Sequence, residues 1–456
     1  MVSLPANRPA QDTVTDWTVI KTSGSSLADQ VLFGTNLPVH VPGTSTLNGT
    51  MVVYLDQDGA SYNNAGTIWN YDTAGNNGVG NTHFGIAGIG SVSNSGLIVS
   101  EVTGVSGDIT GNLAIGVDAE GFNNSGQVYA QVDVGTAIGF ATENPFEAHF
   151  DNSGLVAARA GTGDADGMVF ANGGYLVNEA SGSILAEGPN AVALSFGRGL
   201  YPTDPLALPQ IYNQGLIEAQ STDPNTPSVG ILVQHLDVEQ MFIVNSGTVE
   251  GDYAFYASPG DFSPPQEGTE TLTNNSTGVL KGEVYFGGGD DVLNNSGSIV
   301  GNVLMGDGND VFDNSTGTLQ GMTNLGFGDD LFRGGAGFDA ARGEAGNDQL
   351  YGNGGNDLLI GDRGDDLLDG GAGNDGLYGD FGNDTIVTKG GDVVSGGGGD
   401  DRVELGDYTF ASADGGDGFD TLVLPDNGKV LDLSQALASG RIIGFEAIEL
   451  SGSEGI

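Results

Sequence analysis

Residues 343–369 read GEAGNDQLY-GNGGNDLLI-GDRGDDLLD, which are three consecutive copies of a nine-residue unit. The unit has the pattern Gly-Gly-x-Gly-x-Asp-x-apolar-x, and seven copies follow one another at strict spacing, with Ala341 as the weakest apolar position. A shortened copy then carries Asp392, Asp401 restores the spacing, and a detached copy carries Asp420. The aspartates of the seven regular copies are Asp330, Asp339, Asp348, Asp357, Asp366, Asp375 and Asp384. A repeat this short and regular predicts a β-solenoid.

The length of the unit determines how the copies stack. Nine residues divide into a turn of about six and a strand of about three, so two units form one coil with a turn at each edge. Aspartates in successive coils then stack at about one strand spacing, ~4.8 Å, which predicts Asp330 beneath Asp348 and Asp339 beneath Asp357. Two carboxylates this close repel by roughly 3 kcal/mol at an effective dielectric constant near 20. Such rows require cations between the carboxylates.

Calcium suits these rows, because it takes six to eight oxygen ligands and accepts irregular geometry. Glycine-rich turns direct main-chain carbonyl oxygens inward at backbone angles that glycine adopts at low cost. A metal role is not assigned to Asp291 or Asp310, because no regular repeat lies eighteen residues beyond either, and Asp392 and Asp420 stay open. The predicted ligands are the seven aspartates, Asp401, and the turn glycines Gly328, Gly337, Gly346, Gly355, Gly364, Gly373, Gly382 and Gly399.

Residues 325–404 and the detached copy at 415–422 resemble the nonapeptide β-roll of the repeats-in-toxin (RTX) family, over about a fifth of the chain. The resemblance implies calcium-dependent folding and type I secretion from Gram-negative bacteria, with an extracellular or cell-surface location. It also implies export of the unfolded chain, guided by an uncleaved C-terminal signal. The start at residues 1–6 fits, since it lacks the basic residues and apolar core of a cleaved signal peptide. Residues 431–452 are similar to sequence that flanks such repeats.

A second repeat, Asn-(Asn/Ser)-(Ser/Ala)-Gly-x-apolar, precedes the nonapeptides. From Gly66 its glycines are separated by 30, 30, 28, 28, 33, 32, 31, 19 and 20 residues. A step of about thirty residues predicts one coil of a right-handed parallel β-helix, with strands at 97–99, 114–117 and 230–233. Stacked asparagines at the coil corners are expected to form a hydrogen-bonded ladder.

The two repeat systems interleave at residues 286–320, which predicts one continuous all-β solenoid with shrinking coils. The predicted parts are an N-terminal cap (1–60), a parallel β-helix (61–324), a calcium β-roll (325–422) and a C-terminal cap near the secretion signal (423–456). Proline-rich stretches at 201–209 and 258–266 are interpreted as protruding loops.

Composition limits the partners of the chain. Acidic residues outnumber basic ones 60 to 12, for a formal charge of −48. This charge repels phosphate backbones and anionic membranes and attracts cations, so nucleic acid is excluded as a partner. The absence of cysteine excludes disulfides and thiolate chemistry. No apolar run approaches the length of a transmembrane segment.

No catalytic constellation emerges from the sequence. None of the four histidines lies in a His-Glu-x-x-His motif. We therefore interpret the chain as a calcium-binding structural protein that is surface-layer-like, adhesive or filament-forming, with self-association or a surface polysaccharide as partner. The alternatives are a polysaccharide lyase or epimerase carrying an RTX module and, ranked lower, a toxin. Local acid–histidine groups, interpreted as solvated loops, are Glu143, Glu147 and His149, and His235, Asp237 and Glu239.

Overall fold

The chain divides into two compact units, Met1–Gln266 with Leu280–Gly282, and Glu267–Val279 with Glu283–Ile456. The structure is a computed structural model. It describes residues 20–22, 29–31, 44–47, 51–64, 67–72, 82–102, 112–119, 121–142, 149–170, 174–197, 210–234, 240–258, 268–425 and 431–451.

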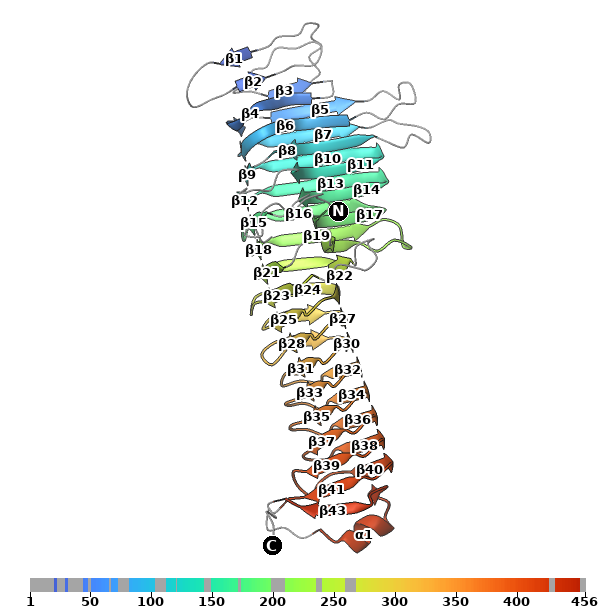
Figure 1. Cartoon of the computed structure of the whole chain (residues 1–456). Helices are drawn as coiled ribbons and strands as arrows, with labels where there is room; N and C mark the ends of the chain where they lie inside the picture. Colours follow the sequence, from blue (N-terminus) through green and yellow to red (C-terminus); the bar gives the residue numbers. More distant parts are fainter. Residues whose placement is uncertain are drawn as a thin grey trace. The chain divides into compact units, whose positions relative to one another are not determined.

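The described part of the first unit is a parallel β-helix built from three ladders of strands (Figure 1). The first ladder contains β3 (Thr44–Leu47), β5 (Thr67–Asp72), β7 (Leu97–Val102), β10 (Gln127–Val134), β13 (Leu155–Thr162), β16 (Ser183–Gly188) and β19 (Leu216–Ser221). The second contains β4 (Met51–Asn64), β6 (Thr82–Asn94), β8 (Leu113–Asp118), β11 (Thr136–Thr142), β14 (Asp164–Phe170), β17 (Asn190–Phe196) and β20 (Val229–Gln234). The third contains β9 (Gly121–Asn124), β12 (His149–Asn152), β15 (Tyr175–Asn178), β18 (Gln210–Asn213) and β21 (Met241–Asn245). The long strand β22 (Thr248–Ser258) pairs with both β19 and β20, and β1 (Ile20–Thr22) pairs antiparallel with β2 (Asp29–Val31).

The register of the first ladder confirms the coil length predicted from the sequence. From Leu97 to Thr248, successive stacked residues are separated by 30, 28, 28, 33 and 32 positions. These steps equal the intervals between the repeat glycines, so each repeat contributes one coil. The strands expected at 97–99, 114–117 and 230–233 lie within β7, β8 and β20.

The asparagine ladder is also confirmed. Each side-chain amide from Asn94 to Asn213 donates to the side-chain oxygen of the asparagine one coil further on, at 2.7–2.9 Å. Every member is at most 2% exposed. The ladder therefore supplies hydrogen bonds to polar groups whose burial without a partner would be unfavourable. Its members in this unit are Asn94, Asn124, Asn152, Asn178, Asn213 and Asn245.

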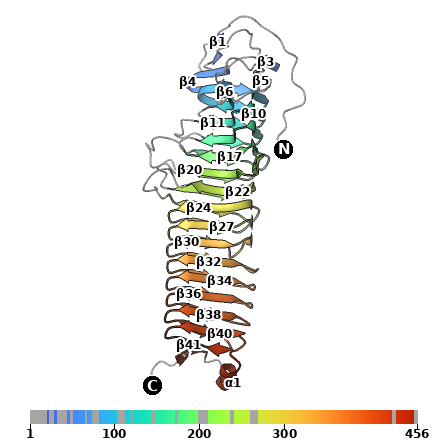
Figure 2. The same cartoon turned by 90° about the vertical axis from the view of Figure 1, so that its right-hand side faces the viewer.

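The second unit is a narrower solenoid built mainly from two long parallel ladders, one of which faces the viewer in Figure 2. One ladder contains β23 (Glu270–Asn274), β25 (Val292–Asn295), β28 (Val311–Asp313), β31 (Leu331–Arg333), β33 (Gln349–Tyr351), β35 (Leu367–Asp369), β37 (Thr385–Thr388), β39 (Arg402–Leu405), β41 (Thr421–Leu424) and β43 (Ala447–Leu450). The other contains β24 (Val279–Gly288), β27 (Val303–Asp307), β30 (Thr323–Phe327), β32 (Ala340–Ala345), β34 (Leu358–Arg363), β36 (Gly376–Phe381), β38 (Val393–Gly398), β40 (Ser412–Asp417) and β42 (Ile442–Ile443). The short strands β26 (Ser298–Val300) and β29 (Thr318–Gln320) pair with each other, and the helix α1 (Leu433–Ala438) starts after its N-cap Asp432.

The interleaved coils and the nonapeptide coils share these ladders. Phe312 pairs with Phe332, and Phe332 pairs with Leu350, so the change of repeat occurs without a break in the interior. Seven successive strands of the ladder from β28 to β41 each contribute one interior side chain that is 0% exposed: Phe312, Phe332, Leu350, Leu368, Ile386, Val403 and Leu422.

The interior narrows where the nonapeptides begin. Five residues before each of the first three stacked aspartates lies a buried apolar residue, namely Phe286, Met305 and Leu325. From Gly343 onward this position is glycine. With no side chain to accommodate, the coil closes at eighteen residues, as the register from Phe332 to Leu350 and Leu368 shows.

The predicted fold class, an all-β parallel solenoid, is confirmed. The domain boundaries proposed from the sequence stay predictions. Most of residues 1–60, all of 201–209 and nearly all of 258–266 lie outside the described residues. Within the described part of the chain, no helix is long and apolar enough to cross a bilayer.

Candidate metal centre

Buried aspartates form two rows along opposite turn edges of the second unit. The long row contains Asp291, Asp310, Asp330, Asp348, Asp366, Asp384, Asp401 and Asp420. The short row contains Asp339, Asp357, Asp375 and Asp392. Each member is at most 3% exposed. The eight aspartates predicted as ligands all lie in these rows, with Asp348 stacked on Asp330 and Asp357 stacked on Asp339, as expected.

In every row aspartate except Asp339, one carboxylate oxygen accepts a backbone N–H of the preceding coil. The N–H of Asp330 donates to Asp348 Oδ1 at 2.9 Å, and the N–H of Asp348 donates to Asp366 Oδ1 at 2.8 Å. The same bond repeats at 2.7–2.9 Å along both rows. The donor always belongs to the earlier coil, so the bonds have one direction along the chain.

The other carboxylate oxygen, Oδ2, is buried and has no hydrogen-bond partner in all eight members of the long row and in Asp357 and Asp375. A buried anionic oxygen without a partner is strongly unfavourable, and it must be neutralised by a proton or a cation. The donor set fits calcium, which prefers carboxylate and carbonyl oxygens. Among the described residues, no three His, Cys, Asp or Glu side chains gather around one point, so each ion would also need main-chain oxygens.

From Gly334 onward, the glycine at the first position of each regular unit makes room for the Oδ2 atom. A Cβ built on Gly361 would overlap Asp366 Oδ2 and lie 2.9 Å from the carbonyl oxygen of Gly379. Gly343 has the same relation to Asp348 Oδ2 and to the carbonyl of Gly361. Carboxylate and carbonyl oxygens therefore converge in the space that a side chain would fill. The repeat pattern predicts ligand roles for the glycine at the fourth position of each unit, whereas this role of the glycine at the first position depends on contacts between coils.

The glycines at the fourth position of the nine-residue unit shape the turns. Six of the eight predicted positions have φ between 127° and 143°, a region that glycine occupies without strain: Gly328, Gly346, Gly355, Gly364, Gly382 and Gly399. Their carbonyls stack, since a Cβ on Gly364 would overlap the carbonyl oxygen of Gly346. Gly337 and Gly373 lie outside this φ region, and a Cβ on Gly337 would meet nothing within 4 Å.

The short row is closed at both ends by protein donors. Asp339 accepts from the Asn314 side chain at 3.1 Å and from the Gly335 N–H at 2.7 Å. Asp392 Oδ2 accepts from the Thr388 hydroxyl at 2.8 Å and the Lys389 N–H at 2.7 Å. Only Asp357 and Asp375 in this row therefore keep an oxygen open to a cation. The ligand role of Asp339 stays a prediction.

Burial is the main cause of raised pKa values in both rows, and repulsion between neighbouring carboxylates adds to it. It raises the pKa from an ordinary value of 3.8 to about 7 in Asp330, Asp348 and Asp384. It raises the pKa to about 6 in Asp357, Asp366 and Asp401. In the absence of metal and at a pH between the ordinary and the raised pKa values, these aspartates therefore keep their protons in the folded roll, whereas the unfolded chain has already released them.

This difference predicts that the metal-free protein is more stable at pH 5 than at pH 8. The raised pKa values stabilise the folded state below about pH 4, and this contribution is lost as the pH rises through 6 to 7. Each unit of raised pKa corresponds to about 1.4 kcal/mol. Urea unfolding of metal-free protein, followed by circular dichroism at both pH values, measures the effect. With calcium bound the trend should reverse, because protons and calcium compete for the same oxygens; equal metal-free stability at the two pH values would contradict the prediction.

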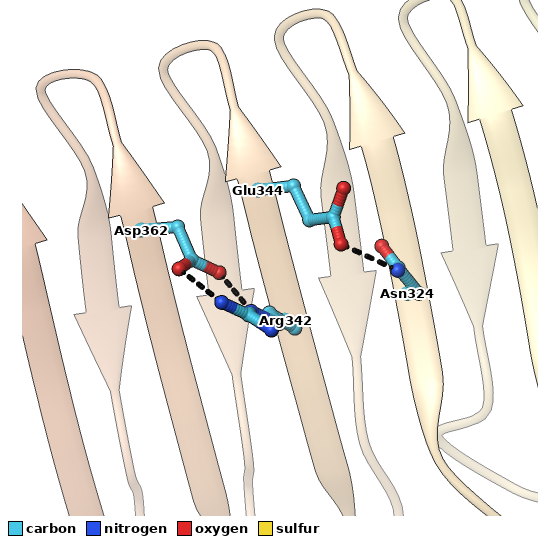
Figure 3. A network of polar contacts seen from close by, with 4 residues as sticks. All are labelled: Asn324, Arg342, Glu344 and Asp362. Carbon is cyan, nitrogen blue, oxygen red and sulfur yellow. Dashed lines mark hydrogen bonds and ion pairs between the residues drawn. The ribbon is translucent and has the colours of Figure 1, made fainter.

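A second layer of carboxylates lies outside the long row, and its members have protein partners (Figure 3). Glu344 and Asp362 are stacked on each other and have φ of 77° and 73°, and the coil before Glu344 has Gly326 at the same position. Arg342 donates from both Nε and Nη2 to Asp362, and Asn324 donates to Glu344 at 2.7 Å. These outer carboxylates are satisfied by the protein, in contrast to the buried Oδ2 atoms.

The acid–histidine groups considered for catalysis are only partly visible. His149 is exposed, lies 3.5 Å from the Asp151 carboxylate and packs on the Tyr175 ring at 4.3 Å. Glu143, Glu147 and residues 235–239 lie outside the described residues. A groove on the first unit is lined by serine, glycine, leucine and glutamine, including Ser95 and Gln127, and its lining contains no acidic or basic side chain.

Comparison with known proteins matches the second unit alone. The family model of the RTX calcium-binding nonapeptide repeat, which comprises four copies, matches residues 326–359, 351–386 and 387–407. No curated protein and no solved structure matches the chain. The matched segments contain the short row and the long row from Asp330 to Asp401, and they leave Asp291, Asp310 and Asp420 outside.

Proposed function

Because the chain is an RTX β-roll protein, and such repeats indicate a calcium-binding, type I secreted protein, we propose that it is a structural component of the bacterial cell surface or extracellular matrix. In this function the calcium ions hold a long solenoid in shape, and the solenoid is surface-layer-like, adhesive or filament-forming. Its partners are further copies of the chain or a surface polysaccharide. The ligands are the row aspartates together with carbonyls of the glycine turns.

The observation that carries the proposal is the repetition of open, buried carboxylate oxygens along the rows. Each lies between two coils rather than in a cleft that a substrate enters. An ion placed there links successive coils, which is a structural role. The rows also explain how export and folding are compatible, because carboxylate repulsion disfavours the compact state where calcium is scarce. Outside the cell, calcium binding and folding proceed together along the stack.

The surface of the second unit supports association as well. Phe327, Phe381 and Phe419 are 63%, 68% and 58% exposed near the turns of the long row. Turns of the same row also carry exposed acidic residues, including Asp329 and Asp365. Apolar side chains on a strongly acidic surface supply contact points once calcium has reduced the repulsion between copies.

Electron microscopy of the purified full-length protein tests this function. We expect ordered sheets or filaments in calcium and dispersed particles after chelation. Monomers that persist in calcium at high protein concentration would contradict the structural role. Turnover of alginate-like or pectin-like polymers by the same preparation would favour the alternative of a lyase or epimerase with an RTX module.

A further inference from the structure

Asp310 lies outside the matched repeats, yet its surroundings are the same as those of Asp330 inside them. Both are 1% exposed, and Oδ1 of each accepts one backbone N–H at 2.7 Å. Oδ2 of each has no partner. The residue five positions earlier is a buried apolar side chain in both coils, Met305 and Leu325. In burial, in the Oδ1 hydrogen bond and in the open Oδ2, the two carboxylates are alike.

The same pattern continues to Asp291 one coil earlier. Asp291 is 0% exposed, its Oδ1 accepts from the Glu270 N–H at 2.6 Å, and its Oδ2 has no partner. Burial raises its pKa to about 10, and the negative charge of Glu270 adds to the effect. Glu270 is also 0% exposed, so two buried acidic groups meet at this end of the row.

The turns of these two coils provide the same carbonyl column as the nonapeptide turns. Gly289 and Gly308 have φ of 116° and 142°, and Gly328 follows with 127°. A Cβ on Gly308 would overlap the carbonyl oxygen of Gly289, and one on Gly328 would overlap that of Gly308. Main-chain oxygens thus stack beside the long row from Gly289 onward.

The opposite corner of these coils is different. The side chain of Asn274 donates to Asn295 at 2.7 Å, Asn295 donates to Asn314 at 2.7 Å, and Asn314 donates to Asp339. This corner is uncharged and satisfied by its own hydrogen bonds. Any cation in these coils would bind on the long-row side alone.

We propose that the long row binds divalent, calcium-type cations beyond the matched repeats, at Asp310 and Asp291, in coils whose other corner is an asparagine ladder. The inference rests on calcium binding by the matched repeats and extends it by two coils. The ligands are Oδ2 of the two aspartates with main-chain oxygens of the adjoining glycine turns. The competing explanation is that both carboxyl groups are protonated and neutral.

Asp310→Asn separates these explanations. Asparagine keeps an Oδ1 that accepts the Asp291 N–H and has nearly the shape of a neutral carboxylic acid, but it offers no second anionic oxygen. Counting bound calcium by equilibrium dialysis, we expect the variant to hold at least one ion fewer than the wild type. The control is Asp290→Asn in the neighbouring coil, which removes an exposed charge and should leave the count unchanged. An unchanged count in Asp310→Asn would overturn the proposal.

Hydrogen exchange on the wild-type full chain gives a second test that does not depend on a variant folding. The N–H groups of Asp291 and Asp310, which donate to the next carboxylates, should lose protection when calcium is withdrawn. Calcium-dependent protection at 326–407 with none at 286–313 would overturn this inference and leave the proposed function intact. Protection that is independent of calcium in both segments would overturn both.

Discussion

Withdrawing calcium at pH 8 is expected to unfold the nonapeptide coils while the first unit keeps its β-structure. Ten buried carboxylates, eight in the long row and two in the short row, each leave an oxygen without a hydrogen-bond partner within the described part of the chain. Because pH 8 lies above most of the raised pKa values of these groups, protons do not replace the metal. One site at 100 times its dissociation constant contributes about 2.7 kcal/mol, so losing several ions removes a free energy comparable to the 5–15 kcal/mol typical of a folded domain.

Hydrogen exchange with and without chelator measures this effect segment by segment. Protection at residues 326–407 should fall at least about 100-fold. Residues 112–258 serve as an internal control, because asparagine amides and an apolar interior stabilise that unit. Full protection of residues 326–407 in chelator at pH 8 would refute a structural role for calcium.

Gly361→Ala adds only one methyl group to a strand residue. It is nevertheless expected to reduce calcium affinity at least about tenfold. The new Cβ would overlap Asp366 Oδ2 and lie 2.9 Å from the carbonyl oxygen of Gly379. Both are candidate ligands, so the methyl group must displace one or both. Overpacking of this kind typically costs about 1–3 kcal/mol before any ligand is lost.

Gly337→Ala is the matched control for this substitution. Gly337 belongs to the same repeat pattern, but its added Cβ would meet nothing within 4 Å. Calcium titrations followed by circular dichroism should give a control midpoint equal to that of the wild type and a midpoint shifted to higher calcium for Gly361→Ala. Equal midpoints for the two variants would show that the space beside the first glycine is not part of the site.

The sequence predicts the rows well, because nine-residue spacing translates directly into stacking. Asp330, Asp348 and Asp366 stack as their positions in the repeat require, and the glycine intervals of the first unit reappear as its coil lengths. Periodic features of this kind depend only on the number of residues in each repeat. They can therefore be predicted from the sequence without the three-dimensional structure.

The features that sequence reasoning missed depend on contacts between coils. Asp310 was set aside because no repeat follows it at eighteen residues, but a coil of twenty residues places it in the same row as Asp330. Asp339 is closed by Asn314, which lies 25 residues away in the preceding coil. The shortened copy keeps Asp392 in the short row at a step of 17 residues. The fixed offset of eighteen, taken from the regular repeats, could not predict these positions.

The one-way hydrogen bonds along the rows give the solenoid a growing end. A folded coil presents a fixed backbone N–H toward the downstream side, where it can orient the aspartate side chain of the next coil. In the same bond, the upstream side of a coil contributes a rotatable carboxylate. An ordered upstream coil therefore acts as a seed, and a metal-loaded segment elongates more readily toward the C-terminus than toward the N-terminus.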